Sequence, residues 1–475
     1  MKLLIISFAL SFFSFGVYAQ SKIIPPKFKL AVQAYNQGLY YTAATHLNDY
    51  IKEMSGKGLN AQAYRLLDRI LVRTNVFPFL SIPLSTLQSH KGSSAISYLM
   101  AKKYFMKKDY KSSLKHFSAV KSNSPFHLQS LLHLSGIAQL LGEIPASISY
   151  SERCMRRARR GFSITPYGRK SNDDLREFIH DSCEINIARA YYKQNDIQKS
   201  EKFFSQIPLN SYHFPTALFE NSWNYYLQRN FGRSVGKNIT FQAPALENYF
   251  IPETELVKAL SYSELCLWDD VIGVIRSFDG NIKKQAQEMI SKYNLKSKKN
   301  PYPFVNLLIN QQKLSEVESP LFQRLARIIN LRPGMKVLMF YLEQVRSEKK
   351  VIEQKASSRS NQLAYNKAYS NYVSFMNAYI KLQFINFANE IIRINNIFAE
   401  MEVDLYSQLK YQHYDQEREQ DEIQEDGKGP SEKLFFIRKL KRDKSQHYWN
   451  FHGEFWADEL GSYIPVLENQ CKEKL

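Results

Sequence analysis

One spacing of small and aromatic residues recurs along the first 285 residues of this 475-residue chain. Counted from a small residue, an aromatic stands at +3, a turn-former at +7, an aromatic or aliphatic residue at +9, a second small residue at +12 and an apolar residue at +16. Three copies are Ala101, Tyr104, Lys108, Tyr110, Ser113, Phe117; Ala188, Tyr191, Asn195, Ile197, Ser200, Phe204; and Ala259, Tyr262, Cys266, Trp268, Val271, Ile275. An earlier copy is Ala31, Ala34, Gly38, Tyr40, Ala43, Leu47. Such a period indicates helix pairs stacked into a solenoid, and solenoids usually bind rather than catalyse.

The intervals between copies show where the period holds and where it breaks. Looser copies begin at Ser135 and Ser222, each 34 residues after a full copy, and Ala259 follows Ser222 by 37 residues. One divergent copy fits into Ala63–Leu80, and the 53-residue interval from Ser135 to Ala188 equals 34 plus an insertion of 19. The pattern resembles the tetratricopeptide repeat (TPR), whose helix pairs recur every ~34 residues. The resemblance implies an all-α, TPR-like α-solenoid of about six to seven helix pairs.

Beyond the repeats, we expect a long helical hairpin or a coiled-coil-like region. Apolar residues from Tyr365 to Leu405 follow one another in steps of three and four, which is a near-heptad stripe. Val337–Glu353 is also predicted to be helical, and Ser357–Ser360 provides a turn. We expect the hairpin to fold against its own chain, with an intermolecular coiled coil as the alternative.

The predicted organisation has six parts. They are a signal peptide (1–19), a TPR solenoid (20–285), a transitional segment (286–334), a long helical hairpin (335–414), an acidic mobile linker (415–430) and a basic–aromatic tail (431–475) that caps the solenoid.

The N-terminus has the features of a secretory signal. Lys2 supplies the positive start, Leu3–Val17 is apolar, and a small-x-small site predicts cleavage after Ala19. An uncleaved anchor is the alternative. No later segment has about 18 consecutive apolar residues, so we expect a periplasmic protein without a spanning helix after the signal.

The four cysteines are compatible with disulfides in an exported protein. They are Cys154, Cys183, Cys266 and Cys471, and they allow three connectivities. Cys154 and Cys183 fall on neighbouring predicted helices, so they are the first pair to test. The alternative is that all four are buried as small apolar residues.

Net charge and motifs narrow the function classes. The charge of +19 favours anionic partners, and outside the inner membrane these are envelope proteins, peptidoglycan or another anionic polymer, or a membrane surface, rather than nucleic acid. The sequence contains no HExxH, GxSxG, P-loop or GxGxxG motif and no CxxC pair. We therefore expect no catalytic residues, no metal and no cofactor, and hence no enzyme.

The first candidate site is a partner-binding groove. In the TPR family the first helix of each pair lines a concave groove, and the positions one, four and five after the small crossing residue face it. On this chain these positions are Lys102, Phe105, Met106, Arg189, Tyr192, Lys193, Trp223, Tyr226 and Leu227. Aromatics interspersed with cations suit an extended or helical peptide. The alternative is that the C-terminal hairpin fills the groove.

The second and third candidate sites are the arginine-rich insertion and the aromatic tail. Guanidinium groups suit phosphate and carboxylate, which makes the insertion an anion-binding or partner-binding loop, or else a solvated helix end followed by a loop. Its residues are Arg153, Arg156, Arg157, Arg159, Arg160, Arg169 and Lys170. The tail residues, which either dock a partner or cap the solenoid, are Tyr448, Trp449, Phe451, Phe455 and Trp456.

A narrower resemblance rests on the tail and on one inner stretch. The sequence YWNFHGEFW from Tyr448, followed by Asp458–Gly461, is similar to the C-terminal signature of exported TPR proteins from gliding and predatory bacteria, some of them from the adventurous-gliding machinery. Pro252–Glu253 followed by Ala259, Tyr262, Cys266 and Trp268 is similar to a second stretch there. The resemblance implies a non-enzymatic periplasmic scaffold or adaptor for protein–protein interaction in an envelope complex. The alternative is an accessory protein that binds cell wall or anionic polysaccharide.

Overall fold

The computed structural model describes residues 25–54, 59–88, 92–160, 169–246, 249–293, 320–331, 333–354, 358–426 and 460–471. Six regular helix pairs follow one another: α1 (Pro26–Asn36) with α2 (Tyr40–Glu53), α5 (Ser94–Met106) with α6 (Tyr110–Ser118), α7 (His127–Leu140) with α8 (Ile144–Arg159), α9 (Arg169–Lys193) with α10 (Ile197–Ser205), α11 (Phe214–Leu227) with α12 (Phe231–Ile239), and α13 (Glu253–Ser263) with α14 (Trp268–Ser277). We call the first helix of each pair the A helix and the second the B helix. These pairs confirm the predicted all-α, TPR-like solenoid.

The divergent copy is also a helix followed by shorter turns. It consists of α3 (Ala61–Thr74), the 3₁₀ turn η1 (Phe77–Phe79) and the short helix α4 (Leu84–Gln88). Two further 3₁₀ turns, η2 (Thr240–Gln242) and η3 (Pro244–Leu246), lie between α12 and α13. After α14 the chain continues through the π-helical turn η4 (Phe278–Lys283) into α15 (Lys284–Tyr293).

The small residues of the repeat lie where the A and B helices cross. Ala101 and Ser113 are fully buried, and the Ser113 hydroxyl donates a hydrogen bond to the Ala101 carbonyl at 2.9 Å. The same bond joins Ser234 to the Ser222 carbonyl at 3.0 Å. A larger side chain at either position would separate the two backbones, which explains the small residues at the start of the pattern and at +12.

The turn-former at +7 adopts a left-handed backbone conformation in every regular pair. The values of φ are 82° at Gly38, 60° at Lys108, 79° at Gly142, 62° at Asn195, 56° at Arg229 and 55° at Cys266. The next residue then caps the B helix in three pairs, where Asp109, Asp196 and Asn230 accept from the backbone N–H three residues on. The period thus specifies the A-helix end, the turn and the B-helix start.

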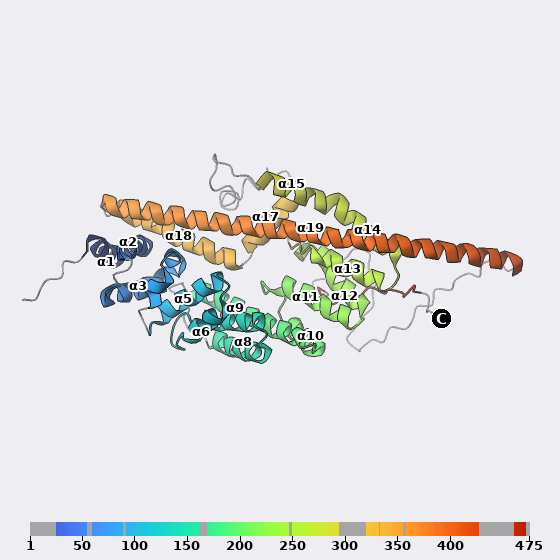
Figure 1. Ribbon diagram of the computed structural model, residues 1–475, viewed down its shortest axis with the longest axis horizontal. Helices are drawn as coiled ribbons and strands as arrows, with labels where there is room; N and C mark the ends of the chain where they lie inside the picture. Colours follow the sequence, from blue (N-terminus) through green and yellow to red (C-terminus); the bar gives the residue numbers. More distant parts are fainter. Residues whose placement is uncertain are drawn as a thin grey trace, which may run out of the picture.

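The C-terminal part forms the predicted long hairpin. After α17 (Pro320–Leu331), α18 (Pro333–Gln354) runs antiparallel to α19 (Arg359–Asp426) (Figure 1). With 68 residues, α19 is about 100 Å long. We expected Asp415–Asp426 to belong to an acidic mobile linker. In the structure, this acidic stretch is instead the last part of α19. Residues 427–430 lie outside the described part.

The helix α19 spans the whole solenoid and contacts both of its ends (Figure 1). Near its N-terminus, Tyr372 packs edge-on against Tyr41 of the first pair, with ring centroids 6.5 Å apart. Towards its C-terminus, Phe398 packs edge-on against Phe278 after the last pair, at 5.1 Å. The apolar stripe predicted from the sequence is the buried side of α19, so the hairpin closes the solenoid as a strut.

The closure depends on a buried carboxylate of α18. No side chain caps α2 from its own sequence neighbourhood. Instead Glu348, 4% exposed, accepts hydrogen bonds from the Tyr41 N–H at 2.6 Å, the Thr42 N–H at 3.0 Å and the Thr42 hydroxyl at 2.8 Å. Backbone donors at a helix N-terminus favour a negative charge. Burial outweighs these bonds and raises the pKa of Glu348 to about 7.

A C-terminal strap, which we define as residues 460–471, lies along α12. The Lys237 ammonium donates to the Gly461 carbonyl, and the Gln470 N–H donates to the Leu265 carbonyl at 2.9 Å. A disulfide joins Cys471 to Cys266 in the turn between α13 and α14.

A second disulfide joins Cys154 of α8 to Cys183 of α9. This is the pair that the sequence analysis singled out as the first to test. None of the described helices combines the length and the apolar character needed to cross a bilayer.

We predict that Gly236→Ala displaces the strap. A Cβ at Gly236 would lie 1.9 Å from the Tyr463 carbonyl oxygen, which is backbone and cannot move alone. Gly136→Ala is the matched control, because a Cβ there meets nothing within 4 Å. Hydrogen exchange in α12 should accelerate in Gly236→Ala and stay unchanged in Gly136→Ala; unchanged exchange in both would contradict the packing described.

We also predict that Glu348 makes the stability of this protein depend on pH. The pKa of Glu348 in the folded state is about 7, above its usual 4.5, so the folded chain holds a proton that the unfolded chain loses between these values. The free energy of unfolding should therefore fall by about 2–3 kcal/mol as the pH rises from 4.5 to 7. Glu348→Gln should flatten this dependence and exposed Glu343→Gln should not, as measured by urea unfolding.

Candidate functional site

The structure divides the predicted groove residues into two groups. At the second regular pair, Phe105 of α5 is partly buried against the hydrophobic core that also includes Tyr341 of α18. Lys102 lies beside them, with its ammonium 3.0 Å from Nε2 of His133. Burial lowers the pKa of Lys102 to about 8 and holds that of His133 well below 6.5.

At the fourth and fifth regular pairs the predicted groove residues mainly connect neighbouring A helices. The Arg189 guanidinium donates to both carboxylate oxygens of Glu220, at 2.7 Å from Nε. Trp223 packs edge-on against Tyr226, whose hydroxyl donates to Glu264 at 3.2 Å. Tyr192 is partly buried, and exposed Lys193 donates to the Gln139 carbonyl at 3.3 Å. These contacts set the spacing of the repeats.

A row of exposed side chains follows the C-terminal ends of the A helices. Met106, Leu140 and Leu227 stand five residues after the crossing residue of their repeats and are 64%, 58% and 49% exposed. Lys193 occupies the same position in the repeat between Leu140 and Leu227, and its bond to the Gln139 carbonyl places it next to Leu140. We call these four residues the A-helix end row. The sequence analysis did not include Leu140 among the groove residues, although it stands five residues after Ser135, the first residue of a looser copy.

Five of the seven predicted insertion residues lie at the end of α8, as in the alternative of a solvated helix end followed by a loop. Arg153, Arg156, Arg157 and Arg159 lie on α8, Arg160 ends it, and Arg169 and Lys170 belong to the first turn of α9. The side chains of Arg169 and Lys170 and residues 161–168 lie outside the described part. Arg157 donates to the Ser122 carbonyl at 2.8 Å, and Arg156 lies 3.6 Å from Glu152. Extending α8 and α9 accounts for much of the insertion, because α9 has 25 residues.

Next to this insertion, His180, Asp181 and Glu184 bring three groups of metal-ligand type together. Nδ1 of His180 lies 3.0 Å from Asp181, and Nε2 accepts from Arg159 at 3.1 Å. Asp181 also accepts from the Ser211 hydroxyl at 2.6 Å. Both imidazole nitrogens are therefore occupied by protein groups, and we assign the cluster to tertiary structure.

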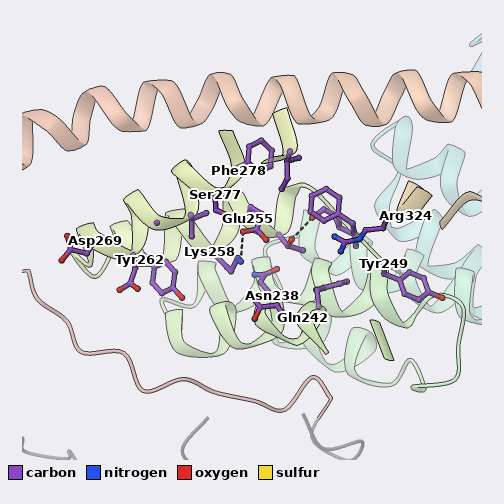
Figure 2. Close-up of a pocket in the computed structure, with 18 residues that line it drawn as sticks. Asn238, Gln242, Tyr249, Glu255, Lys258, Tyr262, Asp269, Ser277, Phe278 and Arg324 are labelled. Carbon is purple, nitrogen blue, oxygen red and sulfur yellow. Dashed lines mark hydrogen bonds and ion pairs between the residues drawn. The ribbon is translucent and has the colours of Figure 1, made fainter. Parts of the chain in front are cut away.

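A pocket of about 530 Å³ lies beside the last helix pair (Figure 2). Its walls come from α12, the η2–η3 connection, α13, α14 and η4, with Arg324 contributed by α17. Lys258 and Glu255 form an ion pair at 2.7 Å in its middle. The sequence analysis did not predict this pocket. Its one sequence signal is the 37-residue interval from Ser222 to Ala259, whose extra residues form the longer α12–α13 connection.

Two predicted features lie outside the described residues. These are the signal peptide (1–19) and the tail residues Tyr448, Trp449, Phe451, Phe455 and Trp456.

Together, the fold and the surface define an all-α, TPR-like solenoid closed by its own C-terminal hairpin. No family model matches the sequence, and no curated protein is significantly similar to it. Among solved structures, the chain is similar to the apo form of RapI, with a TM-score of 0.37 and 11% identity over 74% of this chain and 96% of that one. It is also similar to a Rap protein complexed with Competence and Sporulation Factor, with a TM-score of 0.29 and 12% identity over 74% and 98% of the two chains. Both TM-scores are low, and we draw no functional conclusion from them.

We predict that Lys102→Met stabilises the protein at pH 7. The lowered pKa of Lys102 means that folding places a charged ammonium in an unfavourable environment, and methionine removes this cost while filling similar space. The free energy of unfolding should rise by about 1–2 kcal/mol. The gain should shrink above pH 8, where the lysine of the folded chain loses its proton. Exposed Lys193→Met is the control and should change little; equal effects of the two variants would contradict this account.

Proposed function

We propose that this chain is a non-enzymatic periplasmic scaffold that holds protein partners in an envelope complex, of the kind that gliding or cell-surface machinery contains. The observation that carries the proposal is the A-helix end row. Exposed large apolar side chains stand at the same position in three of four successive repeats, and exposed apolar surfaces of this kind mark protein interaction sites. Apolar side chains that are spaced along several repeats fit the surface of a partner protein better than a small molecule.

The closed frame supports this function because it fixes the row. The strut α19 contacts the first and the last regular pair, and Glu348 joins α18 to α2. A solenoid held at both ends by one helix resists bending, which keeps Met106, Leu140 and Leu227 at a defined spacing, so a partner orders little of the protein when it binds.

Export to the periplasm is part of the proposal. Two disulfides, Cys154–Cys183 and Cys266–Cys471, are typical of proteins in oxidising compartments, and they agree with the secretory features of residues 1–19. The resemblance of the tail to exported TPR proteins of gliding and predatory bacteria suggests the envelope machinery as the setting.

We predict that Met106→Ser, Leu140→Ser and Leu227→Ser together abolish partner capture without unfolding the chain. Burying each apolar side chain at an interface contributes about 1–2 kcal/mol, so losing three should weaken binding by more than a hundredfold. The mature protein, immobilised after cross-linking in the source cells, would be compared with the triple variant by quantitative mass spectrometry. Leu209→Ser, which removes a 50% exposed leucine from the turn before α11, is the matched control.

A reproducible partner that is lost from the triple variant and kept by Leu209→Ser supports the scaffold. Identical capture by all three proteins argues against the row as the docking surface.

A second candidate function, binding of cell wall or anionic polysaccharide, is favoured by the arginines of α8. Arg153, Arg156 and Arg160 are exposed on one helix, and Glu152 is the one acidic group within ion-pair distance of them among the described residues. Sedimentation with purified peptidoglycan separates the two functions. Retention that depends on these arginines and not on the A-helix end row would favour the second.

A further inference from the structure

A second heptad stripe runs along α19, on the side that faces away from the solenoid. Its positions follow one another in steps of four and three without interruption, and we call them the outer stripe: Ala378, Leu382, Ile385, Asn389, Ile392, Asn396, Ala399, Val403 and Tyr406. Each of the first eight stands two residues before a member of the apolar stripe predicted from the sequence, as Leu382 stands before buried Phe384. Two residues turn an α-helix by about 200°, so the two stripes lie on opposite sides of α19.

The outer stripe is exposed and carries no charge. Leu382, Val403 and Tyr406 are 52%, 70% and 61% exposed, and of the other members only Ile385 and Ile392 are partly buried. The solvent-facing side of a helix normally carries charged residues, but none of these nine residues is charged. Apolar residues in strict heptad steps are the pattern of a helix that packs along a second helix. The described part of the chain leaves this stripe exposed, so a helix that covers it comes from another molecule.

Two asparagines of the outer stripe indicate which helix this is. In heptad notation Leu382, Asn389, Asn396 and Val403 occupy position a, and the other members occupy position d. In a parallel pair of identical helices each a residue meets its own copy, and two asparagine amides can donate to and accept from each other. In an antiparallel pair each a residue faces a d residue, so the buried amides would face alanine or isoleucine and lose their hydrogen bonds. The asparagines therefore favour a second copy of α19, parallel and in register.

The flanking charges allow two copies to approach, although the whole chain carries a net charge of +19. In a parallel pair, position g of one helix lies opposite position e of the other, five residues further along. Every charged residue at these positions then lies opposite an uncharged residue, so no like charges meet. The charged residues are Lys381, Arg393, Glu400 and Glu402.

The size of the outer stripe suits a reversible contact. From Ala378 to Tyr406 the helix is about 42 Å long, and a helix is about 10 Å wide. The contact thus covers roughly 400 Å² of each copy in projection, which is at the low end of specific interfaces.

We propose that two copies of this protein associate through their outer stripes, as a parallel two-stranded coiled coil of α19. The outer stripe contains no residue of the A-helix end row, so the two surfaces are separate and each dimer presents two such rows. The proposal does not rest on the scaffold function.

The first test is sedimentation velocity of the full mature protein between about 1 and about 200 μM. We expect a reversible monomer–dimer equilibrium with a dissociation constant on the order of 10 μM. Leu382→Lys with Val403→Lys should raise this constant at least about tenfold, because like charges would then face each other in the seam. Leu363→Lys is the matched control, since Leu363 is 62% exposed on the same helix and lies outside the outer stripe.

All three positions are exposed, so thermal melting should show that the variants stay folded. A parent chain that is monomeric throughout this range, or equal weakening by Leu363→Lys, overturns the proposal.

A second test uses the asparagines. Asn389→Ile with Asn396→Ile should tighten the association about tenfold or more, because a polar residue at position a specifies the register at a cost in stability. Exposed Asn366→Ile, away from the outer stripe, is the control and should change nothing. Unchanged association of the double variant counts against these asparagines as seam residues.

A cysteine at position 403 tests the direction of the two helices. All four native cysteines are in disulfides, so Val403→Cys adds a free thiol. Mild oxidation should link two Val403→Cys chains, because each residue 403 meets its own copy, and should not link two Leu363→Cys chains. A link between Ala378→Cys and Val403→Cys chains, with none between two Val403→Cys chains, indicates an antiparallel pair and overturns the proposed register.

Partner capture is measured separately. A parent chain that stays monomeric yet captures its partner refutes the dimer and leaves the scaffold function intact, whereas a dimer without partners refutes only the scaffold function.

Discussion

The contact of one long helix with both ends of the repeat array determines the shape of this protein. An open solenoid is held only by contacts between neighbouring repeats, so small changes at each interface add up to bending. Here α19 packs on α2 near Tyr372 and on η4 near Phe398, and these two contacts are separated by most of the solenoid. Bending of the array would therefore disturb the packing of α19 on α2 and on η4.

The attachment of the strut uses polar as well as apolar contacts. Glu348 replaces the missing cap of α2, His46 pairs with Asn361 at 3.0 Å, and Lys367 pairs with Asp49 at 2.7 Å. Directional bonds specify one register between hairpin and repeat, whereas an apolar stripe with steps of three and four tolerates a shift by one heptad. The same bonds place a titratable carboxylate in the core, and this makes the closure sensitive to pH.

Repeats and hairpin were predictable because both are local patterns. The left-handed turn at +7, with φ of 60° at Lys108 and 55° at Cys266, recurs because every A helix must end at the same distance from the crossing. What the sequence did not reveal depends on distant segments. The Cys266–Cys471 bond spans 205 residues, the capping of α2 by Glu348 spans 306, and the pocket needs Arg324 from α17. No spacing rule relates such positions. Among the groove residues, only the structure separates Phe105, which is partly buried against the core, from Met106, which is exposed beside it.

Closure also determines where a partner can bind. In an open TPR array the concave face is free, but here Phe105 is partly buried against the core that the hairpin shares, and the ion pair of Arg189 with Glu220 ties neighbouring A helices further along. Part of the free energy that an open array would gain from a ligand in the groove is already used for folding, because the shared core buries part of Phe105. We therefore place partner binding at the rim, where Met106 and Leu227 remain exposed, and α19 contacts both ends of the array that carries them. We therefore expect a partner to contact the A-helix end row rather than the concave groove of an open TPR array.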